Sequence, residues 1–245
     1  MKKTYRAEEF FEGKPLEMAK AMDANDMATF RKLAPLVDLA APGRKSMTLL
    51  WYALQLDPPN FKAIETIIRL GVNPDEQIVQ GIGSALDFAL LNNDLRYLQA
   101  MLDGGLSPNH QQPKFELMLQ RAMKQGGLPH VKLLVERGAD VNMHTGIGRT
   151  ALFTSIGTHQ PEIAAYLINH GADVHATNTG GVTIAWAVHS VINRQQSGAL
   201  RTQFEALRDL LISKGAKFPP DPPDVVREQM RRDGKTPAVP PGHQR

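Results

Sequence analysis

The chain has 245 residues, with 28 lysines and arginines against 25 aspartates and glutamates, and it contains no cysteine. The absence of cysteine excludes disulfides, thiolate nucleophiles and cysteine-ligated zinc. The net charge of +3 is mild and the basic residues are scattered, so no concentrated basic face for nucleic acid is expected. No window of about 20 apolar residues occurs, which argues against a membrane-spanning helix. The length fits one domain or one elongated array.

Residues 1–14 are polar but contain the aromatic pair Phe10 and Phe11, and we expect this segment to cap the first repeat. Residues 15–39 predict a first pair of helices with a turn at 23–26, because apolar residues recur there at helical spacing. Similar segments follow, and we place the later units at 41–75, 76–109, 110–142, 143–175 and 176–218.

A short glycine-containing motif ends each successive segment and recurs at a regular spacing. Its glycines are separated by 34, 33 and 33 residues, and a last copy follows 44 residues later; they are Gly71, Gly105, Gly138, Gly171 and Gly215. A fixed period in this range is typical of a repeat array whose units bury their apolar faces only by stacking on neighbours. The sequence therefore predicts a stacked scaffold with a long exposed surface.

Each unit contains the signals of a capped helical pair. In the best preserved unit, Ile163, Ala164, Leu167 and Ile168 fall on one helical face. The glycine after each second helix can adopt the left-handed conformation that ends a helix. Residues Thr48, Thr150 and Thr183 stand where an N-cap is expected.

These residues carry a resemblance to a known family. The segment from Thr150 to Ile156, followed by Pro161–His175 with its closing Gly-Ala-Asp, resembles an ankyrin repeat. Residues 46–54 and 181–188 resemble the same helix opening, although the family's histidine is replaced by Trp51, Asp87, Phe153 and Trp186. The third and fourth units are degenerate, with Ser84 in place of threonine and no motif at 115–120.

The resemblance covers residues 15–218 and implies an all-α fold, an ankyrin-type solenoid of about six helix-turn-helix units with short finger loops. We expect three segments: an N-terminal cap at 1–14, the array at 15–218 and a Pro-rich tail at 219–245. The tail could form an extended strap along the array, a mobile segment or a ligand for an aromatic groove, and a short helix is possible at 225–232. The insertion at 189–200 should lengthen one or both helices of the last unit, either as a functional feature or as drift in a terminal repeat.

Patterns that could indicate chemistry are weak. Residues 146–151, Gly-Ile-Gly-Arg-Thr-Ala, imitate a dinucleotide fingerprint but fall in a finger turn rather than in a βαβ unit. The histidines His159, His170 and His175 share one unit, yet a zinc site needs three or four converging ligands, and His170 fits better as a residue at a helix C-terminus. We therefore predict no cofactor, no metal and no enzymatic activity.

The ankyrin resemblance implies that a partner is held by finger tips and by the concave face of the first helices. The finger tips are more apolar than solvent-exposed loops usually are, and exposed apolar patches of this kind are typical of an interface. Alternatively, Ile78 and Ile82 fold back to fill the degenerate third unit. The predicted partner-binding residues are Arg44, Lys45, Met47, Gln55, Ile78, Gln80, Ile82, Leu91, Asn92, Met143, His144, Ile147, Arg149, Thr158, His159, Thr179, Val182 and His189.

A fainter resemblance concerns the partner. Residues 8–21, 46–54 and 71–74 together look like bacterial ankyrin proteins that act as immunity proteins against type VI secretion effectors, including phospholipases. This resemblance implies a 1:1 complex that blocks the active site of a toxin. The alternative is an intracellular scaffold or regulator. Met1-Lys-Lys is not followed by an apolar segment, so we expect a periplasmic location if an export leader has been removed and a cytoplasmic one otherwise.

Overall fold

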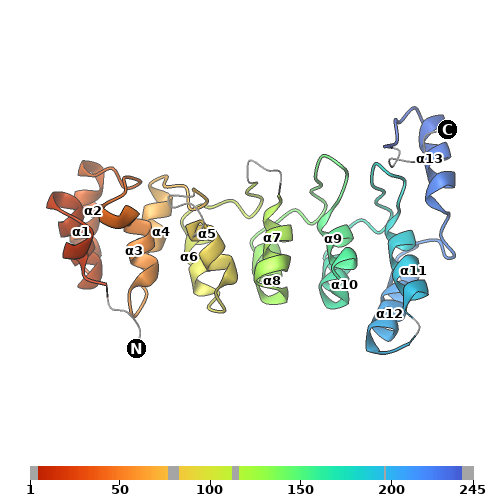
Figure 1. The fold of residues 1–245 in the computed structure, drawn as a ribbon, viewed down its shortest axis with the longest axis horizontal. Coiled ribbons are helices and arrows are strands. Elements are labelled where there is room, and N and C mark those ends of the chain that lie inside the picture. Colours follow the sequence, from red (N-terminus) through yellow and green to blue (C-terminus); the bar gives the residue numbers. More distant parts are fainter. Residues whose placement is uncertain (1–4, 77–82, 112–115, 196, 239–245) are drawn as a thin grey trace. The chain divides into compact units, whose positions relative to one another are not determined.

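The computed structural model describes residues 5–76, 83–111, 116–195 and 197–238. In these ranges the chain is helical, with six successive helical pairs and one further helix after them (Figure 1). The predicted all-α fold of helix-turn-helix units is confirmed. The contacts divide the chain into two units, residues 1–110 and 111–245, and each is described by itself.

The first unit contains three helical pairs. These are α1 (Gly13–Asp23) with α2 (Met27–Leu33), α3 (Leu49–Gln55) with α4 (Phe61–Arg69), and α5 (Ala85–Leu91) with α6 (Arg96–Asp103). Short 3-10 turns occur at Ala7–Glu9, Ala34–Leu36 and Arg44–Ser46. Phe10 and Phe11 are buried, and their rings contact that of Tyr52 in α3. The N-terminal aromatic pair therefore packs against α3 of the second helical pair.

Tyr52 also links the first two helical pairs by a polar contact. Its hydroxyl donates to the carboxylate of Asp23 at the end of α1, with a distance of 2.8 Å to Oδ1. Burial raises the pKa of Tyr52, and the hydrogen bond to Asp23 raises it further. Burial also raises the pKa of Asp23, while the hydrogen bond from Tyr52 opposes that change. The contact ties the end of α1 to the middle of α3.

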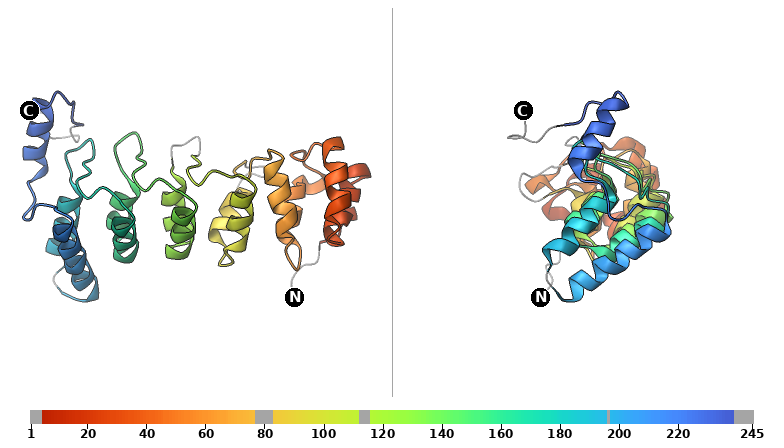
Figure 2. Two further views of the ribbon diagram at one scale, coloured as in Figure 1. Left: turned by 180° about the vertical axis from the view of Figure 1, so that it is seen from behind. Right: turned by 90° about the vertical axis from the view of Figure 1, so that its right-hand side faces the viewer.

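The second unit also contains three helical pairs, followed by a helix from the tail. These are α7 (Met118–Gln125) with α8 (Leu128–Glu136), α9 (Ala151–Gly157) with α10 (Pro161–Asn169), and α11 (Ile184–Arg194) with α12 (Ala199–Ser213), and the tail forms α13 (Pro223–Arg232). Figure 2 shows α9/α10 and α11/α12 side by side, with their finger loops projecting from the same end. The insertion lengthens both helices of the last pair to 11 and 15 residues, against 7 and 9 in α9 and α10.

The first helices begin at the predicted caps. The hydroxyls of Thr48, Thr150 and Thr183 each accept a hydrogen bond from the backbone N–H three residues on. Ser84 forms a full capping box with Asp87, so the unit that looks degenerate in sequence has a complete N-cap. The fourth unit differs, since α7 follows Leu117 and has no side-chain cap.

The second helices end in a common backbone motif. In α10 the chain turns at Gly171 with a φ of 90°, and the N–H of Ala172 donates to the carbonyl of Leu167 at 3.0 Å. Gly138 and Ala139 repeat this pattern after α8. Such a C-cap satisfies helix carbonyls and redirects the chain, and glycine adopts its left-handed conformation without a Cβ clash. The chain therefore leaves each second helix toward the next finger.

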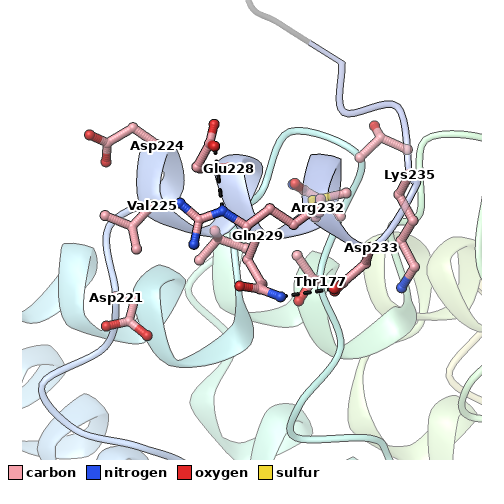
Figure 3. A pocket seen from close by; sticks show the side chains of 13 residues that line it. Thr177, Asp221, Asp224, Val225, Glu228, Gln229, Arg232, Asp233 and Lys235 are labelled. Carbon is pink, nitrogen blue, oxygen red and sulfur yellow. Dashed lines mark hydrogen bonds and ion pairs between the residues drawn. The ribbon is translucent and has the colours of Figure 1, made fainter.

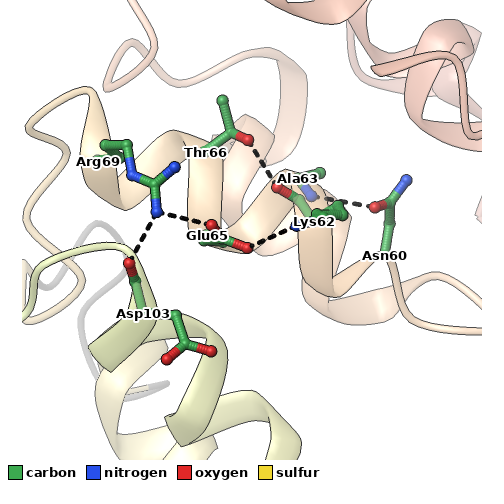
Figure 4. Close-up of polar contacts among 7 residues, drawn as sticks. All are labelled: Asn60, Lys62, Ala63, Glu65, Thr66, Arg69 and Asp103. Carbon is green, nitrogen blue, oxygen red and sulfur yellow. Dashed lines mark hydrogen bonds and ion pairs between the residues drawn. The ribbon is translucent and has the colours of Figure 1, made fainter.

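Neighbouring repeats in the first unit are joined by apolar burial and by backbone contact. Ile64 and Ile67 of α4 are fully buried. Arg69 of α4 pairs with Glu65 at 2.7 Å and donates to the carbonyl of Asp103 in α6 at 3.0 Å (Figure 4). Directly after Asp103, a Cβ on Gly104 would lie 2.7 Å from the carbonyl oxygen of Glu65 and 2.7 Å from Cβ of Ile68. The α4–α6 contact therefore requires a residue without a side chain.

We expect Gly104→Ala to destabilise the protein, because the added Cβ overlaps backbone and a branched side chain that cannot move independently. Overpacking of this kind costs about 1–3 kcal/mol. The measurement is the midpoint of urea unfolding followed by far-UV circular dichroism. Gly146→Ala is the control, because its Cβ meets nothing within 4 Å. An unchanged midpoint for Gly104→Ala would contradict the proposed close packing.

Candidate protein-binding surface

Two finger loops of the second unit contact one another. Each is closed by one antiparallel bridge, His144 with Thr150 and Thr177 with Thr183. The backbone N–H and the hydroxyl of Thr179 both donate to the carbonyl of Ile147 at 3.3 Å. The fingers therefore support each other rather than standing as separate loops.

A shallow groove of about 540 Å³ lies beside the finger at residues 145–149. Its walls combine the finger with polar positions of the first helices α7 and α9. Ile147 in this groove is 58% exposed, so its apolar side chain is accessible to a partner. The lining residues are Gln120, Lys124, Thr145, Gly146, Ile147, Arg149, Thr154, Gly157 and Thr158.

Contacts within the groove fix the finger on the helices. The side-chain amide of Gln120 in α7 donates to the carbonyl of Arg149 at 3.3 Å. A Cβ on Gly157 would lie 3.4 Å from Nη2 of Arg149, so the guanidinium group lies beside the end of α9 where there is no side chain. Lys124 forms an ion pair with Glu116. The groove thus presents an apolar tip, two cationic groups and a flat helix end.

The predicted residues Ile147, Arg149 and Thr158 come together in this groove. Two other predicted residues of the same finger lie nearby in the chain: Met143 is half-buried and accepts a hydrogen bond from Gln111, while His144 is exposed and contacts the carbonyl of Thr145. His159 follows α9, with its ring edge-on to Phe204 of α12. In α11, Nε2 of His189 lies 2.8 Å from the side-chain amide of Asn193.

The predicted residues of the first unit do not gather at one site. Arg44 forms an ion pair with Glu12, and Lys45 lies 3.7 Å from Glu9 and over the ring of Phe10. This finger is therefore held by the acidic N-terminal segment. Elsewhere, Met47 is half-buried, Gln55 lines a separate groove with residues 56–62, and Leu91 and Asn92 end α5. Ile78, Gln80 and Ile82 lie outside the described residues.

The tail covers the tip of the last finger, where Thr179 and Val182 were predicted to bind a partner. Arg227 of α13 donates to the carbonyl of Gly180 at 3.0 Å, and the N–H of Ala238 donates to the carbonyl of Thr179 at 2.7 Å. A Cβ on Gly181 would lie 2.7 Å from Cγ of Arg227 and from the carbonyl of Pro223. Figure 3 shows Thr177 of the finger below the side chains of α13. The predicted short helix is thus docked on the finger.

The sequence interpretation missed Gln120 and Lys124 because the fourth unit lacks a recognisable motif, and it also missed Thr154, although that residue lies in the best preserved unit. The period contains the signal that could have found them. Gln120 lies 33 residues before Phe153, and Lys124 lies 33 residues before Gly157. If the 33-residue period is applied to the degenerate fourth unit, Gln120 and Lys124 fall on its first helix, at the positions of Phe153 and Gly157 in the next unit.

The described ranges contain neither a membrane-spanning helix nor a cluster of metal ligands. Within them, no helix combines the length and apolar character needed to cross a lipid bilayer. In the same ranges, no three histidine or carboxylate side chains converge as a metal site would require. His170 instead stacks on Tyr166 and contacts its backbone carbonyl at 2.8 Å.

The comparisons with known proteins agree with this architecture. A family described as ankyrin repeats (3 copies) matches residues 86–178. The match covers less than half of the chain. Over 63 residues, 26% of this chain, the sequence is 44% identical to protein phosphatase 1 regulatory subunit 27 from Homo sapiens, of which it spans 41%.

Solved ankyrin structures resemble the fold over most of the chain. An ankyrin repeat domain from Acinetobacter baumannii AYE is 21% identical, with a TM-score of 0.56 over 82% of this chain and 98% of that domain. The ankyrin repeat domain of Bcl-3, a member of the IkappaB protein family, is 20% identical, with a TM-score of 0.57 over 85% of this chain and 92% of that domain. The fold is thus an ankyrin-type solenoid.

We expect Arg227→Ala to loosen the tail, because it removes the side-chain contact between α13 and the last finger. Hydrogen–deuterium exchange of residues 223–238 should increase severalfold, whereas exchange in α9 and α10 should not change. Arg231→Ala is the matched control, since Arg231 is exposed and pairs only within α13, with Glu228. Equal exchange in the two variants would show that Arg227 does not hold the tail.

Proposed function

We propose that the chain binds its protein partner through the groove beside residues 145–149 and acts by covering that partner rather than by chemistry. The observation that carries this proposal is the exposed Ile147 next to Arg149 at a groove formed by two repeats. A large apolar side chain beside an arginine is a common composition for the centre of an interface. The groove belongs to a stacked scaffold that can present it with little loss of conformational entropy on binding.

The partner that we propose is a secreted bacterial toxin, for example a phospholipase effector of type VI secretion, held in a 1:1 complex with its active site blocked. This proposal is supported by the resemblance of residues 8–21, 46–54 and 71–74 to bacterial immunity proteins. It implies that the protein acts where the toxin arrives, in the periplasm if the chain is exported and otherwise in the cytoplasm.

A second candidate function is the regulation of an enzyme complex inside the cell. It is favoured by the 44% identity to a phosphatase regulatory subunit over 63 residues. In this case the partner would be an enzyme whose activity or location is adjusted rather than abolished. The two functions differ in the partner and in the effect on its activity.

Reconstitution with candidate enzymes distinguishes the two functions. The full chain is mixed with a phospholipase effector of type VI secretion, and separately with a protein phosphatase catalytic subunit. The mass of each complex is measured by light scattering, and enzyme activity is measured by turnover. The toxin proposal expects a 1:1 complex and loss of toxin turnover at equimolar protein. Cells that lack the protein should then be sensitive to the toxin, and full resistance would contradict the proposal.

We expect Ile147→Asp to weaken partner binding at least tenfold, because it places a charge at the apolar tip of the groove. Isothermal titration calorimetry gives the change in Kd, and circular dichroism confirms folding. Leu70→Asp is the control, since Leu70 is 52% exposed and is not among the residues that line the groove. Equal weakening by the two variants, or none by Ile147→Asp, would place the interface elsewhere.

A further inference from the structure

We infer that the groove of the second unit receives an acidic side chain of the partner, and that an apolar neighbour of this acidic residue packs on Ile147. This inference rests on the proposed binding function and adds the chemistry of the segment that is recognised. It follows from the charges of the groove, from the state of its hydrogen-bond donors and from its size.

The groove is cationic. Among its lining residues are Arg149 and Lys124, and none of the lining residues is acidic. The positive charge of Lys124 is partly compensated, because its ammonium group forms an ion pair with Glu116 outside the lining. Arg149 has no carboxylate partner among the residues that the structure describes. Many other arginines do have one; they include Arg44, Arg69, Arg96, Arg201, Arg208, Arg231 and Arg232.

Most other polar side chains of the groove already make hydrogen bonds within the protein, including Thr145, whose hydroxyl oxygen accepts from the N–H of Arg149 at 3.3 Å. The hydroxyls of Thr154 and Thr158 donate to carbonyls of their own helix at 3.3 and 2.8 Å. The amide of Gln120 donates to the carbonyl of Arg149. The guanidinium group of Arg149 is therefore the principal donor that remains for a ligand, and its planar fork matches a carboxylate.

The groove also has room for a peptide segment. Its volume of about 540 Å³ falls in the range of roughly 300–1,000 Å³ that is typical of ligand sites. Gly157 leaves the end of α9 flat beside Arg149, so a backbone can approach the guanidinium group closely. Ile147 stands at the rim, where an apolar residue next to the acidic one would cover it.

The test uses three synthetic peptides on one frame, Ser-Gly-Leu-X-Leu-Gly-Ser with both ends blocked, in which X is Glu, Gln or Lys. Each is titrated into the isotopically labelled full chain, and NMR shifts of the Ile147 methyl group and the Arg149 side chain are followed. The Glu peptide should bind at least tenfold more tightly than the Gln peptide, and the Lys peptide should bind most weakly. Raising the salt concentration should reduce this preference.

Variants of the protein make the assignment specific. Arg149→Glu should abolish the preference for the Glu peptide and favour the Lys peptide instead. Lys132→Glu makes the same change in net charge at an exposed position of α8 and should leave the preference intact. Equal binding of the Glu and Gln peptides, shifts confined to residues outside the groove, or no binding at millimolar peptide would each overturn the inference.

A separate outcome distinguishes this inference from the proposed function. If Ile147→Asp weakens the complex with the natural partner but Arg149→Glu does not, the groove binds the partner without an acidic anchor. The inference would then be wrong while the binding function stands. If neither variant affects the partner, the proposed binding surface itself is wrong.

Discussion

Stacking is the constraint on which the rest of this protein depends, because no helical pair can bury its apolar face alone. In the first unit, α4 buries Ile64 and Ile67, and the close approach of α6 excludes even a Cβ at Gly104. The first pairs have an additional cover, since Phe10 and Phe11 pack on Tyr52. Because the helices are capped, the backbone enters and leaves each of them in a fixed direction, which sets the path of the chain toward the next repeat.

Departure from the repeat pattern creates the groove. The fourth unit lacks the threonine cap, and α7 begins after Leu117 without a side-chain cap. Where the fifth and sixth units have Phe153 and Trp186, the fourth has Gln120, whose amide reaches the carbonyl of Arg149 on the next finger. A position that is aromatic in the later repeats is thus polar here, and it anchors the finger whose tip exposes Ile147. The degenerate fourth unit therefore supplies the polar side chain that holds this finger.

The sequence predicts those features that depend on local chemistry. The caps at Thr48, Thr150 and Thr183 and the turn at Gly171 follow from spacing alone, because each is determined by backbone geometry within a few residues. The docking of α13 does not follow from the sequence in this way. It depends on a contact between Arg227 and Gly180, which are 47 residues apart, and on the absence of a side chain at Gly181. The partners of Arg44 are equally non-local, so its ion pair with Glu12 could not be predicted.

Three finger tips lie in the described residues, and they differ in what already occupies them. The tip at 44–46 is held by the N-terminal glutamates, and the tip at 178–181 is covered by α13 and the segment that follows it. The tip at 145–149 instead leaves Ile147 exposed and Arg149 without a carboxylate partner in the described part of the chain. Arginine and isoleucine side chains of this kind stabilise a complex most when binding removes them from water. Because segments near the two termini already contact the other two tips, the tip at 145–149 is, of these three described tips, the one on which a partner can gain the most.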